Sequence, residues 1–185
     1  MKTIAGLRAD LLRLLKKDAF RKGAVTLSSG EKSSFYIDGR RVSLNAKGAY
    51  LIAELILDLL KGRKLEAIGG PTLGADPIAG AIAAVSYIKK KPLKTFIIRK
   101  TPKAHGTRRR IEGPDLKPGS RLILIDDVAT SGKSFLESID LLRSEGFKID
   151  TAICIVDRYD GAKEALAQKD CQLISLFTPS DFGIR

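Results

Sequence analysis

The stretch "LILIDDVATSGKSF" (residues 122–135) decides the fold class of this 185-residue chain. Four aliphatic residues in a row, 122–125, predict a strand that is buried on both faces, as in a parallel sheet. The adjacent acids Asp126 and Asp127 end the strand, and a short loop, 128–131, leads into a helix. A buried strand that passes through a short loop into a helix is half of a βαβ unit, so the stretch predicts an α/β protein.

The letters Gly132-Lys133-Ser134 suggest a nucleoside-triphosphate loop, but the spacing rejects it. A Walker A loop, G-x-x-x-x-G-K-[ST], needs a glycine five positions before Gly132. That position holds Asp127. A carboxylate there would face the phosphates that the loop backbone should surround, so we interpret the match as a coincidence.

The same residues suit a single phosphate beside a sugar. The N-terminus of a helix offers free N–H groups and a partial positive charge. Thr130, Ser131 and Ser134 add hydroxyl donors, and Gly132 allows a close approach of the backbone. Acids next to such a pocket can hold sugar hydroxyls or a metal ion, which indicates a sugar phosphate ligand. The alternative is a capped helix with acidic residues in its loop.

Hydrophobic patterns along the rest of the chain extend the alternation of strands and helices. The segment from residue 1 to about 40 does not fit the alternation and is expected to pack as a cap on a single domain, 1–185. The expected helices are 3–22, 46–62, 74–90, 131–145 and 161–169, and the expected strands are two short ones within 24–38, then 66–70, 95–100, 121–126, 151–157 and 172–177.

The net charge of +12 leaves three explanations open: nucleic-acid binding, a solvated Lys-rich surface, or a small polyanionic substrate. Its densest part runs from Arg99 to Arg110, with six cationic residues and His105. This segment contains Pro102 and Gly106 and no aromatic residue, so it is a poor helix and a poor stacking platform for bases. The pattern predicts a mobile basic loop.

Other function classes are excluded or disfavoured by composition. No apolar run approaches the ~20 residues of a membrane span, and charges interrupt the first apolar segment, unlike a secretory signal. The single histidine excludes a zinc cluster built on histidine. Two cysteines are too few for a disulfide framework, and Cys154 lies in an apolar run, so we expect a core thiol and a reducing, cytoplasmic setting.

The opening stretch resembles the phosphoribosyl-pyrophosphate (PRPP) motif of type I phosphoribosyltransferases. Further stretches resemble segments of orotate phosphoribosyltransferases within that family. They are the base-binding segment "LSSGEKSSFYIDGR" (27–40), the pyrophosphate loop "GGPTLGADP" (69–77), the catalytic loop "FIIRKTPKAHGTRRRIEG" (96–113) and "VDRYDGA" (156–162). The resemblance covers nearly the whole chain in order. It implies a central parallel sheet flanked by helices, with a small N-terminal hood at about 1–40.

The resemblance also implies the reaction. The family joins orotate to PRPP and releases orotidine 5′-monophosphate and pyrophosphate, with Mg²⁺ escorting the pyrophosphate. The transition state resembles an oxocarbenium ion, so the protein must stabilise a departing polyanion and a ribosyl cation together. Asp126 or Asp127 is the candidate protein ligand for the metal ion.

Roles for individual residues follow from the same resemblance. The catalytic candidates are Lys103, His105, Asp126 and Asp127, with Lys103 as a candidate proton donor. PRPP and its pyrophosphate would meet Arg99, Lys100, Lys103, His105, Thr72, Leu73 and Gly74. The 5′-phosphate would meet Asp126, Asp127, Val128, Ala129, Thr130, Ser131, Gly132, Lys133 and Ser134. Orotate would meet Tyr36, Ile37, Thr130 and Arg158. The plainer alternatives are core packing for Tyr36 and Ile37 and a surface salt bridge for Arg158.

The resemblance implies a homodimer in which part of the basic loop acts in the neighbouring subunit's site, with no nucleic-acid or membrane partner. A regulator that senses PRPP and binds nucleic acid is the rival hypothesis, and the surface charge of a thermophilic protein is a further explanation of the +12.

Two positions and one segment depart from well-known bacterial relatives. Ser28 and Gly74 stand where those relatives carry lysines, and "TRRR" (107–110) replaces a Gly-rich run. We therefore expect the basic loop to supply more of the charge neutralisation.

Overall fold

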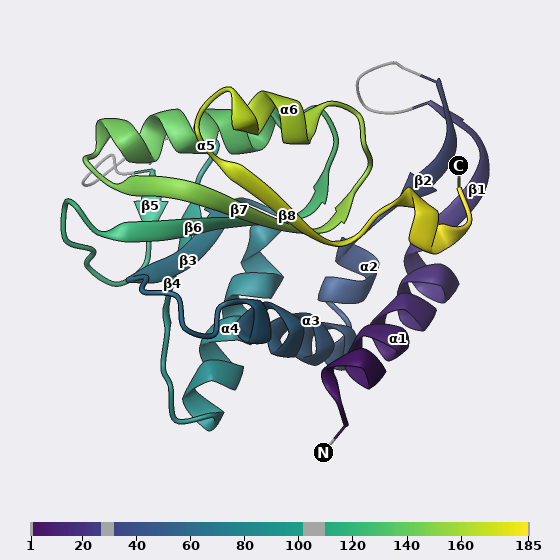
Figure 1. Cartoon of the computed structure of the whole chain (residues 1–185), viewed down its shortest axis with the longest axis horizontal. Coiled ribbons are helices and arrows are strands. Elements are labelled where there is room, and N and C mark those ends of the chain that lie inside the picture. The colour runs from purple at the N-terminus through teal and green to yellow at the C-terminus, as the bar shows by residue number, and fades with distance from the viewer. Residues whose placement is uncertain (1, 27–31, 102–109, 185) are drawn as a thin grey trace.

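Six of the described strands form a mostly parallel central sheet in the order β5-β4-β3-β6-β7-β8 (Figure 1). The computed structural model describes residues 2–26, 32–101 and 110–184, and at 24–26, 32 and 33 it describes the backbone alone. The parallel strands are β3 (Ala67–Pro71), β4 (Lys94–Ile98), β6 (Arg121–Ala129), β7 (Lys148–Asp157) and β8 (Gln172–Phe177). The short edge strand β5 (Ile111–Glu112) pairs antiparallel with β4. The predicted α/β class with a central parallel sheet is confirmed.

Helices cover both faces of this sheet, which explains why its strands are continuously apolar. The helices α3 (Ala46–Leu59) and α4 (Ala75–Ile88) lie on one face, and α5 (Lys133–Ser144) and α6 (Ala162–Ala167) lie on the other (Figure 1). The side chains of 122–125 alternate between the two resulting cores, and all four are buried. Cys154 is a buried thiol in the second core, as predicted.

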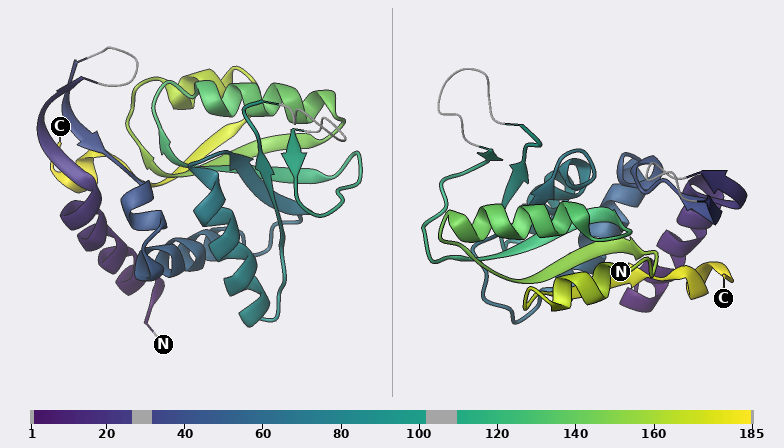
Figure 2. Two further views of the ribbon diagram at one scale, coloured as in Figure 1. Left: turned by 180° about the vertical axis from the view of Figure 1, so that it is seen from behind. Right: turned by 90° about the horizontal axis from the view of Figure 1, so that it is seen from above.

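The N-terminal segment forms a separate layer at one end of the sheet (Figure 2). It consists of α1 (Ile4–Leu14), a π-helical turn η1 (Leu15–Ala19), the antiparallel hairpin of β1 (Phe20–Thr26) and β2 (Lys32–Ile37), and the short helix α2 (Arg40–Ser43). We call residues 2–43 the hood. Its inward face, with Leu11, Leu15 and Phe35, joins the core on the α3–α4 side of the sheet.

The predicted helix 3–22 is wrong at its C-terminal end. Helical conformation stops at Ala19, and Phe20 already has extended backbone angles and pairs with Ile37. The helical spacing of apolar residues continues through Phe20, but the hairpin partner decides its conformation, and that partner is distant in sequence. The sequence also did not predict α2, β5 or the last turn, η2 (Pro179–Phe182).

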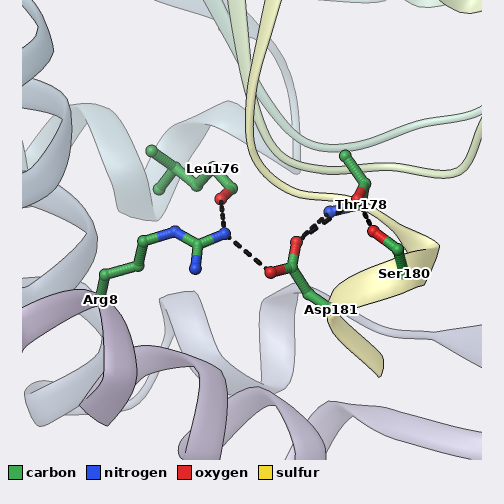
Figure 3. A network of polar contacts seen from close by, with 5 residues as sticks. All are labelled: Arg8, Leu176, Thr178, Ser180 and Asp181. Carbon is green, nitrogen blue, oxygen red and sulfur yellow. Dashed lines mark hydrogen bonds and ion pairs between the residues drawn. The ribbon is translucent and has the colours of Figure 1, made fainter. Parts of the chain in front are cut away.

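The last turn, η2, is tied to the first helix, α1 (Figure 3). Arg8 of α1 donates to the carbonyl oxygen of Leu176 at 3.2 Å and to Oδ1 of Asp181 at 2.8 Å. Its guanidinium also lies over the ring of Phe177, 4.6 Å from the centroid. Asp181 in turn accepts from the backbone N–H of Thr178, which caps η2. The hood is thereby fastened to the end of β8.

None of the helices in the described ranges is both long enough and apolar enough to cross a membrane.

Candidate active site

The topology places one crevice between β3 and β6. From β3 the chain crosses to β4 on one side, and from β6 it crosses to β7 on the other. At such a switch point the loops after two neighbouring parallel strands diverge, which opens a crevice at their carboxyl ends. The β3–α4 loop (72–74) and the β6–α5 loop (130–132) flank it, and the carboxyl end of β7 lies beside β6. Four predicted site segments therefore lie at one edge of the sheet, because β4 also ends there with Arg99.

Asp126 and Asp127 lie within β6, because the strand continues to Ala129 and does not end at the acids as the sequence predicted. Each carboxylate is held by the next residue's backbone. Oδ1 of Asp126 accepts from the N–H of Asp127 at 2.9 Å, and Oδ1 of Asp127 accepts from the N–H of Val128 at 2.9 Å. The acid pair is therefore fixed by regular structure and not by a loop.

The acid pair has perturbed protonation. Burial raises the pKa of Asp126 well above the usual value of an aspartate, and the negative charges of Asp127 and Asp76 add to the shift. Burial also raises the pKa of Asp127, against the hydrogen bonds from the Asp126 side chain and the Val128 backbone and the nearby positive charge of Arg40. Asp126 is thus the site at which the pair most readily keeps a proton, and a cationic ligand would favour its release.

Two glycines bring other segments against the acid pair. A Cβ on Gly74 would overlap Oδ1 of Asp126 and lie 2.6 Å from Oδ1 of Asp127. A Cβ on Gly39, at the start of α2, would lie 2.8 Å from Cβ of Asp127. The hood and the β3–α4 loop therefore both contact the acids, and neither position has room for a side chain.

A small pocket of about 50 Å³ lies at the N-terminus of α5. Its lining comprises Asp126, Val128, Ala129, Thr130, Ser131, Gly132, Lys133, Ser134 and Phe135. The first N–H groups of α5 have no carbonyl partner within the helix, so they are available to an anion. The structure thus brings together every residue predicted for the 5′-phosphate except Asp127, which lies next to the pocket in the same strand.

Gly132 has two structural requirements that the sequence did not reveal. Its φ of +78° is in the left-handed region, which favours glycine. A Cβ at this position would also lie 2.9 Å from Cδ1 of Leu166 and 3.2 Å from Cα of Ala162 in α6. Close packing of α5 against α6 therefore sets the shape of the pocket.

The β3–α4 loop presents Thr72, Leu73 and Gly74 at the crevice. The N–H of Thr72 donates to the carbonyl oxygen of Ile98 at 2.9 Å, and its hydroxyl donates to Asp76 at 2.6 Å. The side chain of Leu73 is exposed, and the Thr72–Leu73 peptide bond is cis. Among the described residues, Oδ1 of Asp76 has no hydrogen-bond partner although it is buried.

A larger cavity of about 720 Å³ separates this loop from the hood. It is lined by Asp38, Arg40, Arg41, Leu44, Asn45, Leu73, Asp76 and Pro77. Sequence reasoning missed Arg40 and Arg41, although they directly follow the segment "FYIDG" that carried the resemblance. Arg40 is paired with Asp38 at 3.1 Å, and this bond raises the pKa of its guanidinium.

Arg158 lies just beyond the carboxyl end of β7, and it is not the exposed salt bridge that was the alternative interpretation. Its side chain is only 4% exposed, although its Nε donates to Asp160 at 3.0 Å. Its guanidinium lies over the ring of Phe35 in the hood, 4.6 Å from the centroid. The backbone N–H of Arg158 donates to the carbonyl oxygen of Ala129, which ties this residue to the end of β6.

Of the other three residues predicted to meet orotate, Thr130 lines the pocket at the N-terminus of α5, whereas Tyr36 and Ile37 are neighbours in β2, so their side chains point to opposite faces of the hairpin. Ile37 is buried in the core, and Tyr36 is half-buried on the other face. The structure therefore does not bring Tyr36 and Ile37 to one surface.

The base of the basic loop is described, but most of the loop is not. The N–H of Arg99 donates to the carbonyl oxygen of Arg110 at 2.8 Å, and Nε of Arg110 donates to the carbonyl oxygen of Arg99 at 3.0 Å. Arg99 also lies 3.7 Å from Glu112, and Lys100 is exposed. The predicted residues Lys103 and His105, and also Arg108 and Arg109, lie outside the described residues.

Comparison with known proteins identifies the family. The model of the phosphoribosyl transferase domain matches residues 43–182. The orotate phosphoribosyltransferase of Synechocystis is 43% identical over 178 residues, which cover 96% of this chain and 89% of the relative. The chain belongs to the orotate phosphoribosyltransferase family.

Solved structures of orotate phosphoribosyltransferases have the same fold. The Mycobacterium tuberculosis enzyme, solved with Fe(III) dicitrate, superposes with a TM-score of 0.83 and 34% identity, over 96% of this chain and 99% of that one. A structure of the same enzyme in complex with PRPP gives a TM-score of 0.79 at 30% identity, with the same coverage. The type I phosphoribosyltransferase fold predicted from the sequence motifs is confirmed.

The acids at the crevice fit a metal ion that is bound jointly by the protein and a substrate better than one that is bound by protein side chains alone. In the described ranges, no three His, Cys, Asp or Glu side chains are grouped to hold a metal by themselves. The acid pair and the unpartnered Oδ1 of Asp76 nevertheless offer oxygen donors at one place. Mg²⁺ is commonly bound by one or two carboxylates, by water and by substrate phosphates, so these residues suit a metal that arrives with a phosphorylated substrate.

Proposed function

We propose that this chain transfers the phosphoribosyl group of PRPP to orotate, giving orotidine 5′-monophosphate and pyrophosphate in pyrimidine biosynthesis. The observation that supports this most strongly is the arrangement at the β3–β6 crevice. An anion pocket lies at one end of the acid pair, the β3–α4 loop covers it, and a buried arginine follows the neighbouring strand. Phosphate, ribose, pyrophosphate and an acidic base each have a chemically matching surface there.

The β6–α5 segment is proposed to bind the ribose 5-phosphate part of PRPP. Backbone N–H groups and hydroxyls from Val128 to Ser134 would hold the 5′-phosphate, supported by the partial positive charge of α5. Asp126 and Asp127 would accept hydrogen bonds from the ribose hydroxyls. Because each already accepts one backbone N–H, their orientation is set before substrate binds.

The reaction breaks the bond between C1 of the ribose and the pyrophosphate oxygen and forms a bond from that carbon to a ring nitrogen of orotate. Negative charge collects on the pyrophosphate, and positive charge develops on the ribosyl group. Arg99, Lys100, Lys103 and His105 are proposed to neutralise the first, with Lys103 as proton donor, and the acid pair to stabilise the second. Thr72, Leu73 and Gly74 would hold the pyrophosphate through their backbone.

Orotate carries a carboxylate, and Arg158 is the proposed partner for it. A guanidinium forms paired hydrogen bonds with a carboxylate, and a buried one makes the stronger contact because water does not compete. Tyr36, Ile37 and Thr130 complete the proposed base site, with Ile37 acting through the packing of the hood.

Mg²⁺ is the proposed cofactor. When bound, it would neutralise negative charge on the departing pyrophosphate. Asp126 or Asp127 is the proposed protein ligand, and the buried Oδ1 of Asp76 is a further donor. A cation at the acid pair would release the proton that burial favours on Asp126, which prepares both carboxylates for the ribose.

The assembly is proposed to be a cytoplasmic homodimer of single-domain chains, in which part of the basic loop acts in the neighbouring subunit's site. Neither nucleic acid nor a membrane is proposed as a partner. The +12 charge then serves a polyanionic substrate.

The test is turnover by the purified protein with PRPP, Mg²⁺ and orotate, followed through the loss of orotate. We expect turnover with orotate and none when Mg²⁺ is removed. Turnover with a purine or uracil, and none with orotate, would reject orotate as the substrate. Absence of turnover together with a steeply salt-dependent affinity for nucleic acid would favour a PRPP-sensing regulator instead.

A further inference from the structure

An aromatic stack runs from the C-terminal turn through the hood to Arg158. The ring of Phe182 in η2 lies 5.1 Å from that of Phe20 at an interplanar angle of 24°. The ring of Phe20 lies 6.2 Å from that of Phe35 at 34°. Cζ of Arg158 is 4.6 Å from the centroid of Phe35. We call Phe182, Phe20 and Phe35 the aromatic stack, and it joins three separate segments of the chain to one cation.

Arg158 is held on two sides by groups of different kinds. Phe35, which is 7% exposed, covers the face of the guanidinium. Asp160 accepts from its edge at Nε. A cation over an aromatic face is attracted by the ring's quadrupole, more strongly where water is excluded. The face contact and the edge contact both restrict the position and the plane of the guanidinium.

The plane of the guanidinium matters for the ligand proposed at Arg158. Paired hydrogen bonds to a carboxylate require the two planar groups to lie nearly in one plane. A guanidinium that could rotate would lose this geometry while keeping its charge. Phe35 is therefore suited to preserve the geometry of a carboxylate contact through its own contact with Arg158.

The stack is anchored at its far end. Phe182 is 8% exposed and also contacts Phe177 edge-on, with centroids 6.5 Å apart. The turn that carries Phe182 is held by Arg8 through Asp181 (Figure 3). Movement of η2 would therefore reach Phe35 through Phe20.

We propose that Phe35, supported by Phe20 and Phe182, is a positioning residue that fixes the Arg158 guanidinium for the carboxylate of the base. The proposal rests on the proposed function for the identity of that base. It assigns to the hood and to the last turn of the chain a role in base affinity, and none in PRPP affinity.

The experiment compares Michaelis constants for both substrates in four proteins: the unmodified chain, Phe35→Leu, Phe35→Tyr and Phe147→Leu. Phe147 is a partly buried phenylalanine before the opposite end of β7, so it controls for the loss of a packed ring. We expect Phe35→Leu to raise the constant for orotate about tenfold, and that for PRPP less than about twofold. Phe35→Tyr keeps an aromatic ring at this position, so its Michaelis constant for orotate should be close to that of the unmodified chain. Phe147→Leu should leave the same constant unchanged.

Phe182→Leu provides a second variant if Phe35→Leu does not fold. Its ring lies two contacts away from Arg158, so a smaller rise, about threefold, is expected in the orotate constant alone. Equal rises for both substrates in a folded variant, or no rise for orotate, would overturn the proposal. Either result would leave the stack with a role in stability only.

A readout that needs no turnover separates this proposal from the proposed function. Modification of Arg158 by phenylglyoxal, followed by peptide mass mapping without substrates, should be slow in the unmodified chain and several-fold faster in Phe35→Leu. The same rate in both proteins would overturn the positioning role even if orotate is the substrate. If the protein instead turned over a different base, and Phe35→Leu raised the Michaelis constant for that base alone, orotate would be rejected as the substrate. The positioning role of Phe35 would stand.

Discussion

Gly74 lies directly against Asp126, so closely that a Cβ at position 74 would overlap Oδ1 of the carboxylate. The resemblance to bacterial orotate phosphoribosyltransferases implies a lysine at this position in those relatives, and a side chain at position 74 would not fit in the present arrangement. Gly74 thus allows the β3–α4 loop to cover the acid pair, and the loop gives up a cation to do so. The missing positive charge lies beside the acid pair, where the basic loop is expected to supply positive charge.

Gly74→Ala should lower kcat/KM by roughly one to two orders of magnitude, since relief of the overlap costs about 1–3 kcal/mol and displaces either the loop or Asp126. Steady-state kinetics with both substrates is the measurement. Gly80→Ala is the matched control, because Gly80 lies in α4 with nothing within 4 Å of its Cβ position. It should keep full activity and gain up to about 1 kcal/mol of stability. Equal activity of the two variants would contradict the steric role.

Asp126→Asn should abolish most activity while stabilising the fold at neutral pH. Folding raises the pKa of Asp126 from its usual 3.8, so its stability contribution is fully present below that pH and is lost as pH rises through the raised value. Asparagine does not ionise, so the variant does not lose this contribution as the pH rises. The free energy of unfolding of the variant, measured in urea, should therefore match that of the unmodified chain near pH 4 and exceed it increasingly toward pH 7.

Asp181→Asn is the matched control for this pH dependence. Burial alone would raise the pKa of Asp181, but the hydrogen bonds from Arg8 and from the N–H of Thr178 outweigh it and lower the pKa. Its contribution is present above the usual aspartate pKa and lost as pH falls, so Asp181→Asn should cost stability at pH 7 and progressively less below pH 4. The same sign of change in both variants would contradict the assignment of the two environments.

Gly132→Ala should weaken PRPP binding as well as the fold. The left-handed φ of Gly132 costs an alanine roughly 1 kcal/mol, and the contact with Leu166 adds to it. Gly119→Ala is the control, because Gly119 has a similar φ of +82° and open space around its Cβ position. Both variants should lose thermal stability, but only Gly132→Ala should raise the Michaelis constant for PRPP, by about tenfold. A rise in both would indicate a general loss of structure.

Replacement of Arg108, Arg109 and Arg110 together by alanine should raise the Michaelis constant for PRPP and lower turnover, because the basic loop is expected to compensate for the missing lysines. The single change Arg110→Ala separates charge from structure, since Nε of Arg110 binds the carbonyl oxygen of Arg99. It should cost about 1 kcal/mol of stability through that bond. If the triple variant kept unchanged kinetic constants, the compensation hypothesis would fail.

Local pattern was enough for much of the fold. Residues 122–125 are apolar on both faces of the strand because the strand lies between two cores. This continuous apolar run is visible in the sequence, so it predicts a strand buried on both faces. Phe20 shows the limit: its conformation depends on pairing with Ile37, which no local spacing reveals. The edge strand β5 is too short to leave a periodic signal.

The site divides in the same way. Backbone-held groups, such as the acid pair and the β6–α5 loop, follow from contiguous motifs and were predicted. Arg40 and Phe35 act through contacts with residues about 90 and 120 positions away, Asp127 and Arg158, and were missed. Both lie within "LSSGEKSSFYIDGR" (27–40), the stretch assigned to the base, but nothing in the sequence distinguished them from its other residues.

The contact between Arg8 and Asp181 spans 173 residues, which has a consequence for synthesis of the chain. A helix of 11 residues such as α1 is marginal by itself in water. At about 5–20 residues per second, the ribosome delivers its partner on η2 roughly 10–35 seconds later. The tie between α1 and the turn after β8 is therefore expected to form last, after the rest of the chain has been synthesised.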